Sequence, residues 1–324
     1  MGYTHLTINE REVILKMQAQ QSSLEQMAER LGRSKGTISR ELRRNVSSTG
    51  DYKPHLAQRY YTKRRQASKA PYRLETDAPL RGLVEAKLKR YWSPEQIIGW
   101  LRKSHTLSLS LTTLYSWVYR DKANGGTLWT FLRQRRRRKR RVGEDRRGQL
   151  PDRRMIDERP AIANARQRLG DWEGDTVEGR KGSGYFATYV DRASRYTAAA
   201  KTADKSAPTI TAATLAVLGV LPAETVKTIT FDNGKEFAGF KELERTLEMD
   251  SYFAHPYHSW ERGSNENTNG LLRQFFPKGM DFSTVDQRDL DIALELLNNR
   301  PRKCLNYRTP AEVFWSQSVR CASD

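Results

Sequence analysis

The sequence predicts an α/β protein in which all-α units precede a domain built on a mixed β-sheet. Three observations support this prediction. The first 45 residues contain three capped helical segments, the excess positive charge lies in the first half of the chain, and the second half alternates between β-leaning and helical segments. With 324 residues and 37% hydrophobic content, the chain is long enough for about two or three domains.

The charge of the chain is divided unevenly. Residues 1–150 hold 33 Lys and Arg against 13 Asp and Glu, a balance of +20, whereas residues 151–324 hold 24 against 25, a balance of −1. The formal net charge of +19 therefore belongs to the first half. This split indicates a basic module that binds nucleic acid, joined to a nearly neutral module whose task looks enzymatic.

Helix-start signals recur three times near the amino terminus. Each pairs a capping side chain with a polar partner three residues later: Thr7 with Glu10, Ser23 with Gln26, and Ser34 with Thr37. Gly32 supplies a sharp turn before the third helix, and Ile38 can fill the core between the helices. This is a helix-turn-helix layout.

The third helix is predicted to contact DNA. Its polar and basic side chains, with those of the preceding turn, stay outside the core: Arg33, Lys35, Ser39, Arg40, Arg43 and Arg44. They can neutralise phosphates while the helix enters a major groove. The alternative is a solvated basic helix in a small bundle.

A weaker signal of the same kind follows. Ser93-Pro94-Glu95-Gln96 is predicted to cap one helix, and residues 112–119 are predicted to form another. Residues 51–132 are therefore predicted to be a second helical unit. This unit either binds DNA or uses its aromatic side chains only to form its core. Seven consecutive basic residues, 135–141, resist packing into a core. The predicted domains are residues 1–50, 51–132, a basic linker 133–152 that also tracks phosphates, and 153–324.

Cysteine usage and hydropathy bear on location. Cys304 and Cys321 have no metal-ligand or disulfide-framework spacing, which fits a reducing cytoplasm. The amino terminus has no signal-peptide core, and no 18-residue apolar run occurs. We expect a cytoplasmic protein, associated with the nucleoid if bacterial, with no membrane partner.

The second half alternates between strands and helices. Three antiparallel strands are predicted at 171–178, 185–190 and 196–201, then a helix at 208–218, a strand at 226–231, a helix at 237–247, a short strand at 252–253 and a helix at 265–275. This order indicates a mixed sheet covered by helices.

Three acidic residues are placed where such a sheet can bring them together. Asp175 lies within the first strand, Asp232 at the carboxyl end of the fourth, and Glu266 at the start of a helix. Three converging carboxylates repel one another unless divalent cations neutralise them. Two ions about 4 Å apart can activate a water or a 3′-hydroxyl and stabilise the departing oxygen at phosphorus.

The motifs around these acids resemble those of a known family. Gly170-Asp171-Trp172-Glu173-Gly174-Asp175, Phe231-Asp232-Asn233-Gly234-Lys235-Glu236-Phe237 and residues 261–270, ERGSNENTNG, are similar to the acidic motifs of the IS-thirty family of bacterial insertion-sequence transposases. Thirty-three residues separate Asp232 from Glu266, as in that family, and residues 299–310 also match its pattern. The resemblance spans nearly the whole chain.

The resemblance implies the ribonuclease H-like fold and the DDE chemistry of transposases and integrases. It implies Asp175, Asp232 and Glu266 as catalytic ligands of two Mg²⁺ ions, with Mn²⁺ as a substitute, and Arg273 as a contact to DNA ends. The partners implied are the inverted-repeat ends of the element and a target duplex, bound by a homodimer or larger assembly. One departure stands out, since Asp171 replaces a histidine of many relatives.

Several alternatives stay open. Glu261 is a rival third ligand, His255 and His258 could act as general bases or be surface groups, and Trp260 could stack on a base or pack under the loop. At the level of function, the rivals are a non-catalytic DNA-binding regulator derived from a transposase and a ribonuclease H-like nuclease that does not join strands.

Overall fold

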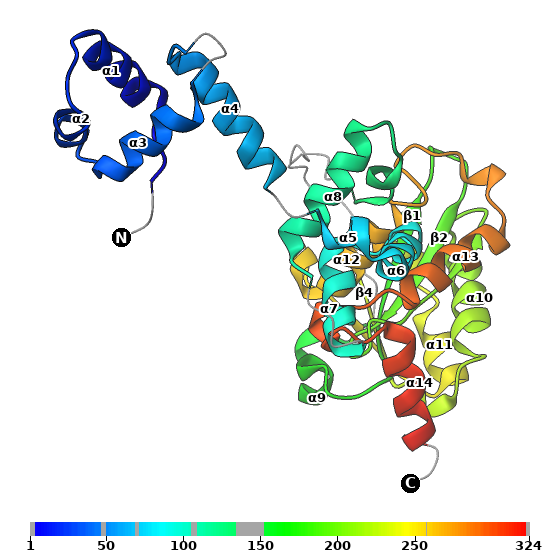
Figure 1. Ribbon diagram of the computed structural model, residues 1–324. Coiled ribbons are helices and arrows are strands. Elements are labelled where there is room, and N and C mark those ends of the chain that lie inside the picture. The colour runs from blue at the N-terminus through cyan, green and yellow to red at the C-terminus, as the bar shows by residue number, and fades with distance from the viewer. Residues whose placement is uncertain are drawn as a thin grey trace. The chain divides into compact units, whose positions relative to one another are not determined.

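The structure is a computed structural model that describes residues 4–46, 50–68, 71–104, 109–133, 152–256 and 258–321. It falls into two compact units, one ending at Thr76 and one beginning at Asp77 (Figure 1). The predicted basic linker, residues 133–152, lies outside the described residues except for its two ends.

The first unit is helical, as predicted. Its helices are α1 (Ile8–Ala19), α2 (Leu24–Leu31), α3 (Lys35–Arg44), α4 (Pro54–Ala67) and α5 (Arg73–Thr76). All three predicted caps form, since the side chains of Thr7, Ser23 and Ser34 accept hydrogen bonds from backbone N–H groups three residues later. Gly32 ends α2 with a φ of 60°, a left-handed conformation that favours glycine. Ile14, Met27 and Ile38 are buried between the helices.

The first unit extends further than the predicted boundary at residue 50, because α4 packs against α1. Arg11 is buried at this junction, and its guanidinium donates to Glu41 Oε1 at 2.7 Å, to the Leu6 carbonyl at 2.7 Å and to the side chain of Gln58 on α4. A buried arginine needs such partners to offset its lost hydration. Helix α4 therefore belongs to the first compact unit, which ends at Thr76.

The second unit opens with three helices, α6 (Ala78–Lys89), α7 (Pro94–Ser104) and α8 (Leu111–Ala123). Sequence patterns predicted a separate body here, but these helices share one compact unit with the sheet. The Tyr91 ring packs edge-on against Phe275 with centroids 5.0 Å apart, and Lys303 Nζ pairs with Glu95 at 2.9 Å. Aromatic side chains are used in two ways: Trp117 is buried, whereas Tyr119 is 56% exposed.

A close approach between α7 and a distant loop supplies a stability test. A Cβ atom added to Gly99 would lie 2.1 Å from the Tyr307 ring, whereas one added to Gly82 on α6 would meet nothing within 4 Å. We expect Gly99→Ala to lower the free energy of unfolding by about 1–3 kcal/mol through overpacking. Gly82→Ala should raise it by about 0.5–1 kcal/mol through helix propensity. Thermal unfolding of both variants measures this, and equal shifts would contradict the packing.

A five-stranded mixed sheet is the centre of the second unit, with strand order β3-β2-β1-β4-β5. The strands are β1 (Asp171–Glu178), β2 (Tyr185–Asp191), β3 (Thr197–Thr202), β4 (Thr228–Phe231) and β5 (Asp250–Phe253). β1, β2 and β3 pair antiparallel, whereas β1, β4 and β5 pair parallel. The predicted α/β class with its mixed sheet is confirmed.

Helices cover both faces of this sheet. They are α9 (Ala161–Ala165), α10 (Ala207–Leu218), α11 (Phe240–Leu247), α12 (Gly263–Leu272), α13 (Gln287–Asn298) and α14 (Pro310–Cys321). One core, around Trp172 and Phe231, lies on the side of α10 and α11, and another, around Phe186 and Phe282, lies on the side of α12 and α13. No helix among the described residues is long and apolar enough to cross a membrane.

Candidate active site

Strand register brings Asp175 and Asp232 to one place. β1 and β4 are parallel, with Glu173 paired to Thr230. Extending this register by two residues sets Asp175 beside Asp232, the first residue after β4, on neighbouring strands roughly 4.8 Å apart. Both side chains then point to the face that α12 covers, because side chains alternate between the faces of a sheet.

Arg262 lies between these two carboxylates. Its Nη1 is 3.6 Å from Asp175 Oδ1, its Nη2 donates to Asp232 Oδ2 at 3.4 Å, and Nη1 also donates to the Gly174 carbonyl at 3.2 Å. The Arg262 side chain is only 12% exposed, and its Nε is buried without a hydrogen-bond partner in the described structure. A cationic group therefore occupies the space between two carboxylates whose oxygens could hold a divalent cation.

Asp175 is enclosed by polar partners. The Thr176 N–H donates to its Oδ1 at 2.9 Å, and Asn269 Nδ2 donates to its Oδ2 at 2.8 Å. Burial raises the pKa of the Asp175 carboxyl above its usual range; the negative charge of Asp232 adds to this shift, and the charge of Arg262 opposes it. Positive charge nearby favours the ionised form of Asp175.

Glu266 is on the helix that runs along β1. It lies four residues after Arg262 and three before Asn269, and both of these side chains contact Asp175. Residues three or four positions apart share one side of a helix, so Glu266 is on the side of α12 that carries Asn269. The Glu266 side chain is exposed, however. Among the described residues, carboxylate oxygens of Asp175, Asp232 and Glu266 do not all lie within 4.8 Å of one another.

A buried ion pair fixes the start of α12. Glu173 is fully buried, its carboxylate pairs with Arg192, and its Oε2 accepts the Asn265 N–H at 3.0 Å. Arg195 also donates to the Ser264 hydroxyl. Sequence reasoning did not assign roles to Glu173, Arg262 or Asn269, although the four-residue interval between Arg262 and Glu266 was a usable signal.

Asp171, the departure from the family pattern, lies elsewhere. Its buried carboxylate accepts hydrogen bonds from Arg168 Nε and Nη2, each at 3.0 Å, and from the Thr228 hydroxyl at 2.8 Å. It is four residues from Asp175 along a strand, a separation of roughly 13 Å. These three hydrogen bonds satisfy the acceptor oxygens of the Asp171 carboxylate.

The other candidates around α12 have their own partners. Glu261, the rival third ligand, is bound by His255 and His258, and these three form a separate cluster. Burial alone would raise the pKa of Glu261, but hydrogen bonds from these histidines hold it below its usual range. Arg273 donates to the Glu178 carbonyl at 2.7 Å. The side chain of Trp260 lies outside the described part of the chain.

In the first unit, the predicted DNA-contacting residues divide into two groups. Arg33 donates to Glu10 Oε1 at 2.9 Å, and Lys35 pairs with Glu25. The others are exposed along α3: Ser39, Arg40, Arg43 and Arg44. Arg40 and Arg44 line a cleft of about 520 Å³ together with Arg64 and Arg65 of α4. Arg11 and Glu41, which form an ion pair, also line it. This cleft suits a phosphate backbone electrostatically.

Comparison with known proteins agrees with both units. Residues 2–45 match the family model of a helix-turn-helix domain, and residues 165–259 match that of an integrase core domain. The second match includes Asp175 and Asp232 and ends before Glu266. A helix-turn-helix unit followed by an integrase core defines a DNA transposase, a polynucleotidyl transferase of the ribonuclease H-like type.

Relatives of full length specify the family. The chain is 42% identical to the transposase for insertion sequence element IS4351 of Bacteroides fragilis, over 96% of this chain and 95% of the relative. It is 38% identical to the transposase for element IS1086 of Cupriavidus metallidurans, over 96% and 94%. It is also 38% identical to the transposase InsI for element IS30A of Escherichia coli, over 96% and 83%. The chain belongs to the IS-thirty family of DDE transposases, as its motifs predicted.

Proposed function

We propose that this transposase binds the inverted-repeat ends of its own insertion sequence, nicks them, and joins the freed 3′-ends to target DNA. The observation that carries the proposal is the convergence of Asp175 and Asp232 around one cationic position, beneath the helix that bears Glu266. The integrase core implies dependence on a divalent metal in general. The basic cleft beside α3 supports DNA binding by the first unit.

Asp175, Asp232 and Glu266 would hold two Mg²⁺ ions, with Mn²⁺ as a substitute. The donor set suits hard cations, since carboxylate oxygens are the ligands that Mg²⁺ prefers. Arg262 places positive charge between the two aspartates, which supports the proposal that cations bind at this position. When bound, the ions would activate the attacking oxygen and stabilise the departing one.

The chain's own residues prepare this reaction. Asn269 and the Thr176 N–H orient the Asp175 carboxylate, and the Glu173–Arg192 pair sets the start of α12 and with it Glu266. Arg262 would withdraw from the aspartates as ions enter. Water first cleaves the phosphodiester at the element's end, leaving a 3′-hydroxyl. That oxygen then attacks a target phosphorus and displaces the target's own 3′-oxygen.

A strand-transfer assay tests this function. The substrate is a labelled duplex carrying the inverted repeats that flank the gene, incubated with an unlabelled target duplex in Mg²⁺, in Mn²⁺ or with a chelator. We expect nicked ends and joined strands with either metal and neither product with the chelator. Binding without cleavage under every metal would instead identify a regulator, and cleavage without joining would identify a nuclease.

Two ends must be processed together, so we propose that a homodimer or larger assembly carries out the reaction. Mass measurement of the complex formed with end DNA checks this. Two or more chains per pair of ends are expected, whereas a single chain bound to each isolated end throughout the reaction would contradict the proposal.

Helix α3, which we propose contacts DNA, supplies a prediction on binding to end DNA. Replacing Arg40, Arg43 and Arg44 by Ala should weaken binding to end DNA and make its salt dependence shallower by roughly 2–3 in the slope of log K against log salt, because each lost phosphate contact removes about 0.9. Titrations at several salt concentrations measure this. A double variant, Lys16→Ala with Arg30→Ala on α1 and α2, is the control for charge alone. An equal change per charge removed would contradict a specific role for α3.

A further inference from the structure

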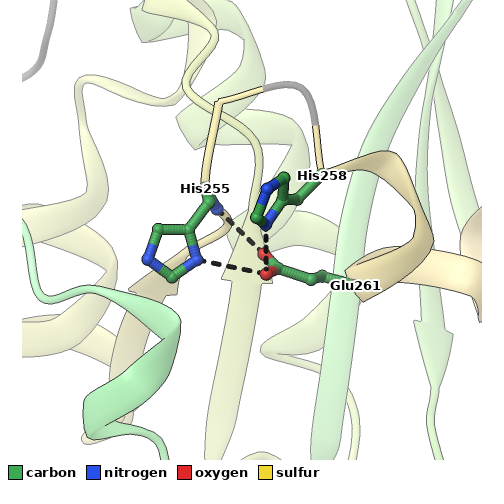
Figure 2. A group of neighbouring side chains, drawn as sticks. All are labelled: His255, His258 and Glu261. Carbon is green, nitrogen blue, oxygen red and sulfur yellow. Dashed lines mark hydrogen bonds and ion pairs between the residues drawn. The ribbon is translucent and has the colours of Figure 1, made fainter.

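A cluster of metal-binding side chains lies in the loop after β5. His255, His258 and Glu261 follow one another at intervals of three residues and converge (Figure 2). The Nδ1 atoms of His255 and His258 lie 3.1 and 3.0 Å from the same oxygen, Glu261 Oε1. All three ligand atoms are within 4.8 Å of one another. The proposed reaction uses none of these side chains.

The donor set matches a zinc-type ion rather than magnesium. Two imidazole nitrogens and one carboxylate oxygen, with water as the fourth ligand, form a known tetrahedral arrangement for Zn²⁺. With metal–ligand bonds of about 2 Å, the edges of such a tetrahedron are roughly 3.3 Å. The two observed N···O separations, 3.0 and 3.1 Å, are close to these edges, so small side-chain shifts would admit the ion.

Groups around the cluster already orient its ligands. The other ring nitrogen of His255, Nε2, lies 2.9 Å from Asp157 Oδ2. A carboxylate in this position is the usual partner of a metal-bound histidine, because it fixes the tautomer that leaves the opposite nitrogen available as a ligand. The backbone N–H of His255 holds the second Glu261 oxygen at 2.9 Å. The remaining oxygen, Oε1, is the one that faces both rings (Figure 2).

We propose that His255, His258 and Glu261 bind one zinc-type transition-metal dication, separate from the catalytic ions. The loop that carries these ligands leads directly into Arg262, whose guanidinium contacts Asp175 and Asp232. An ion here would tie the end of β5 to the start of α12. It would thereby position Arg262 and the helix that bears Glu266, without touching the reacting phosphate.

Metal titration of the full chain tests the proposal. Protein stripped with a chelator is titrated with Zn²⁺ by calorimetry, and with Co²⁺ while the visible absorption of a tetrahedral site is followed, in excess Mg²⁺. We expect one Zn²⁺ or Co²⁺ per chain. Binding should persist in the triple variant Asp175→Asn, Asp232→Asn, Glu266→Gln and disappear in His258→Gln and in Glu261→Gln. Exposed His55→Gln on α4 is the matched control and should bind normally.

Asp157→Asn is the variant least able to disturb folding, since this side chain is 74% exposed. Loss of an orienting carboxylate typically costs 10–100-fold in metal affinity, and we expect a weakening in this range. The proposal is overturned if the stripped protein binds no stoichiometric Zn²⁺, if the His258 and Glu261 variants bind as tightly as the parent, or if the triple acid variant loses the ion. Because the readout is binding without DNA, it is independent of strand transfer.

Discussion

Replacing Asp175 or Asp232 by Asn, or Glu266 by Gln, is expected to abolish strand cleavage in Mg²⁺ while end binding is kept. Each change preserves the size of the side chain but removes the negative charge proposed to hold a dication. Losing several kcal/mol of stabilisation of the departing charge lowers the rate by at least about a thousandfold. Cleavage is measured under single-turnover conditions, and binding is measured by gel shift on the same duplex.

The matched control for this experiment is Glu178→Gln. Glu178 lies on the same strand as Asp175 but is exposed, and within the described residues its carboxylate accepts a 3.4 Å hydrogen bond from the Tyr185 hydroxyl. The Glu178→Gln variant should therefore cleave DNA at the rate of the parent protein. Full cleavage by any of the three acid variants would remove that residue from the site. If the Glu266→Gln variant keeps full cleavage and the Glu261→Gln variant loses it, Glu261 rather than Glu266 is the third acidic ligand.

The second large effect concerns stability. Glu173→Ala would leave Arg192, which is only 4% exposed, with an unpaired buried charge, and would remove the acceptor of the Asn265 N–H. Breaking a buried pair on one side costs about 3–5 kcal/mol. For a unit of this size the unfolding temperature should then fall by roughly 6–20 °C. Differential scanning calorimetry measures this fall directly.

Two further variants separate the ion pair from simple loss of a side chain. Glu178→Ala removes an exposed glutamate from the same strand and should change stability by less than about 0.5 kcal/mol. Replacing Glu173 and Arg192 together by Leu should recover most of the loss, because apolar residues can replace a buried pair at little net cost. Equal effects of Glu173→Ala and Glu178→Ala would show that the pair does not stabilise the sheet and α12.

Local sequence signals predicted the helices and strands but not the contacts between them. The caps at Thr7, Ser23 and Ser34 were predictable because each needs only a partner three residues away. The pairing of Asp171 with Thr228 joins segments 57 positions apart, and no local pattern specifies such a register. The acids could be named from their motifs, but the proximity of Asp175 and Asp232 follows from that register.

The same limit explains the residues and boundaries that sequence reasoning missed. The Arg262 side chain reaches Gly174 across 88 positions, so its place between the aspartates depends on how α12 packs on β1. The helices before residue 132 looked independent, yet Tyr91 meets Phe275 and Gly99 meets Tyr307. Periodicity predicts which face of a helix is apolar but not which distant segment covers it.

The position of Arg262 has a consequence for the protein before it meets metal. Two neighbouring carboxylates on adjacent strands would otherwise push those strands apart or take up a proton. An internal counter-charge lets the two carboxylates stay close together without an ion. The divalent ions of the proposed reaction would have to displace this guanidinium, so the affinity of the pocket for metal would depend on how readily the Arg262 side chain moves away.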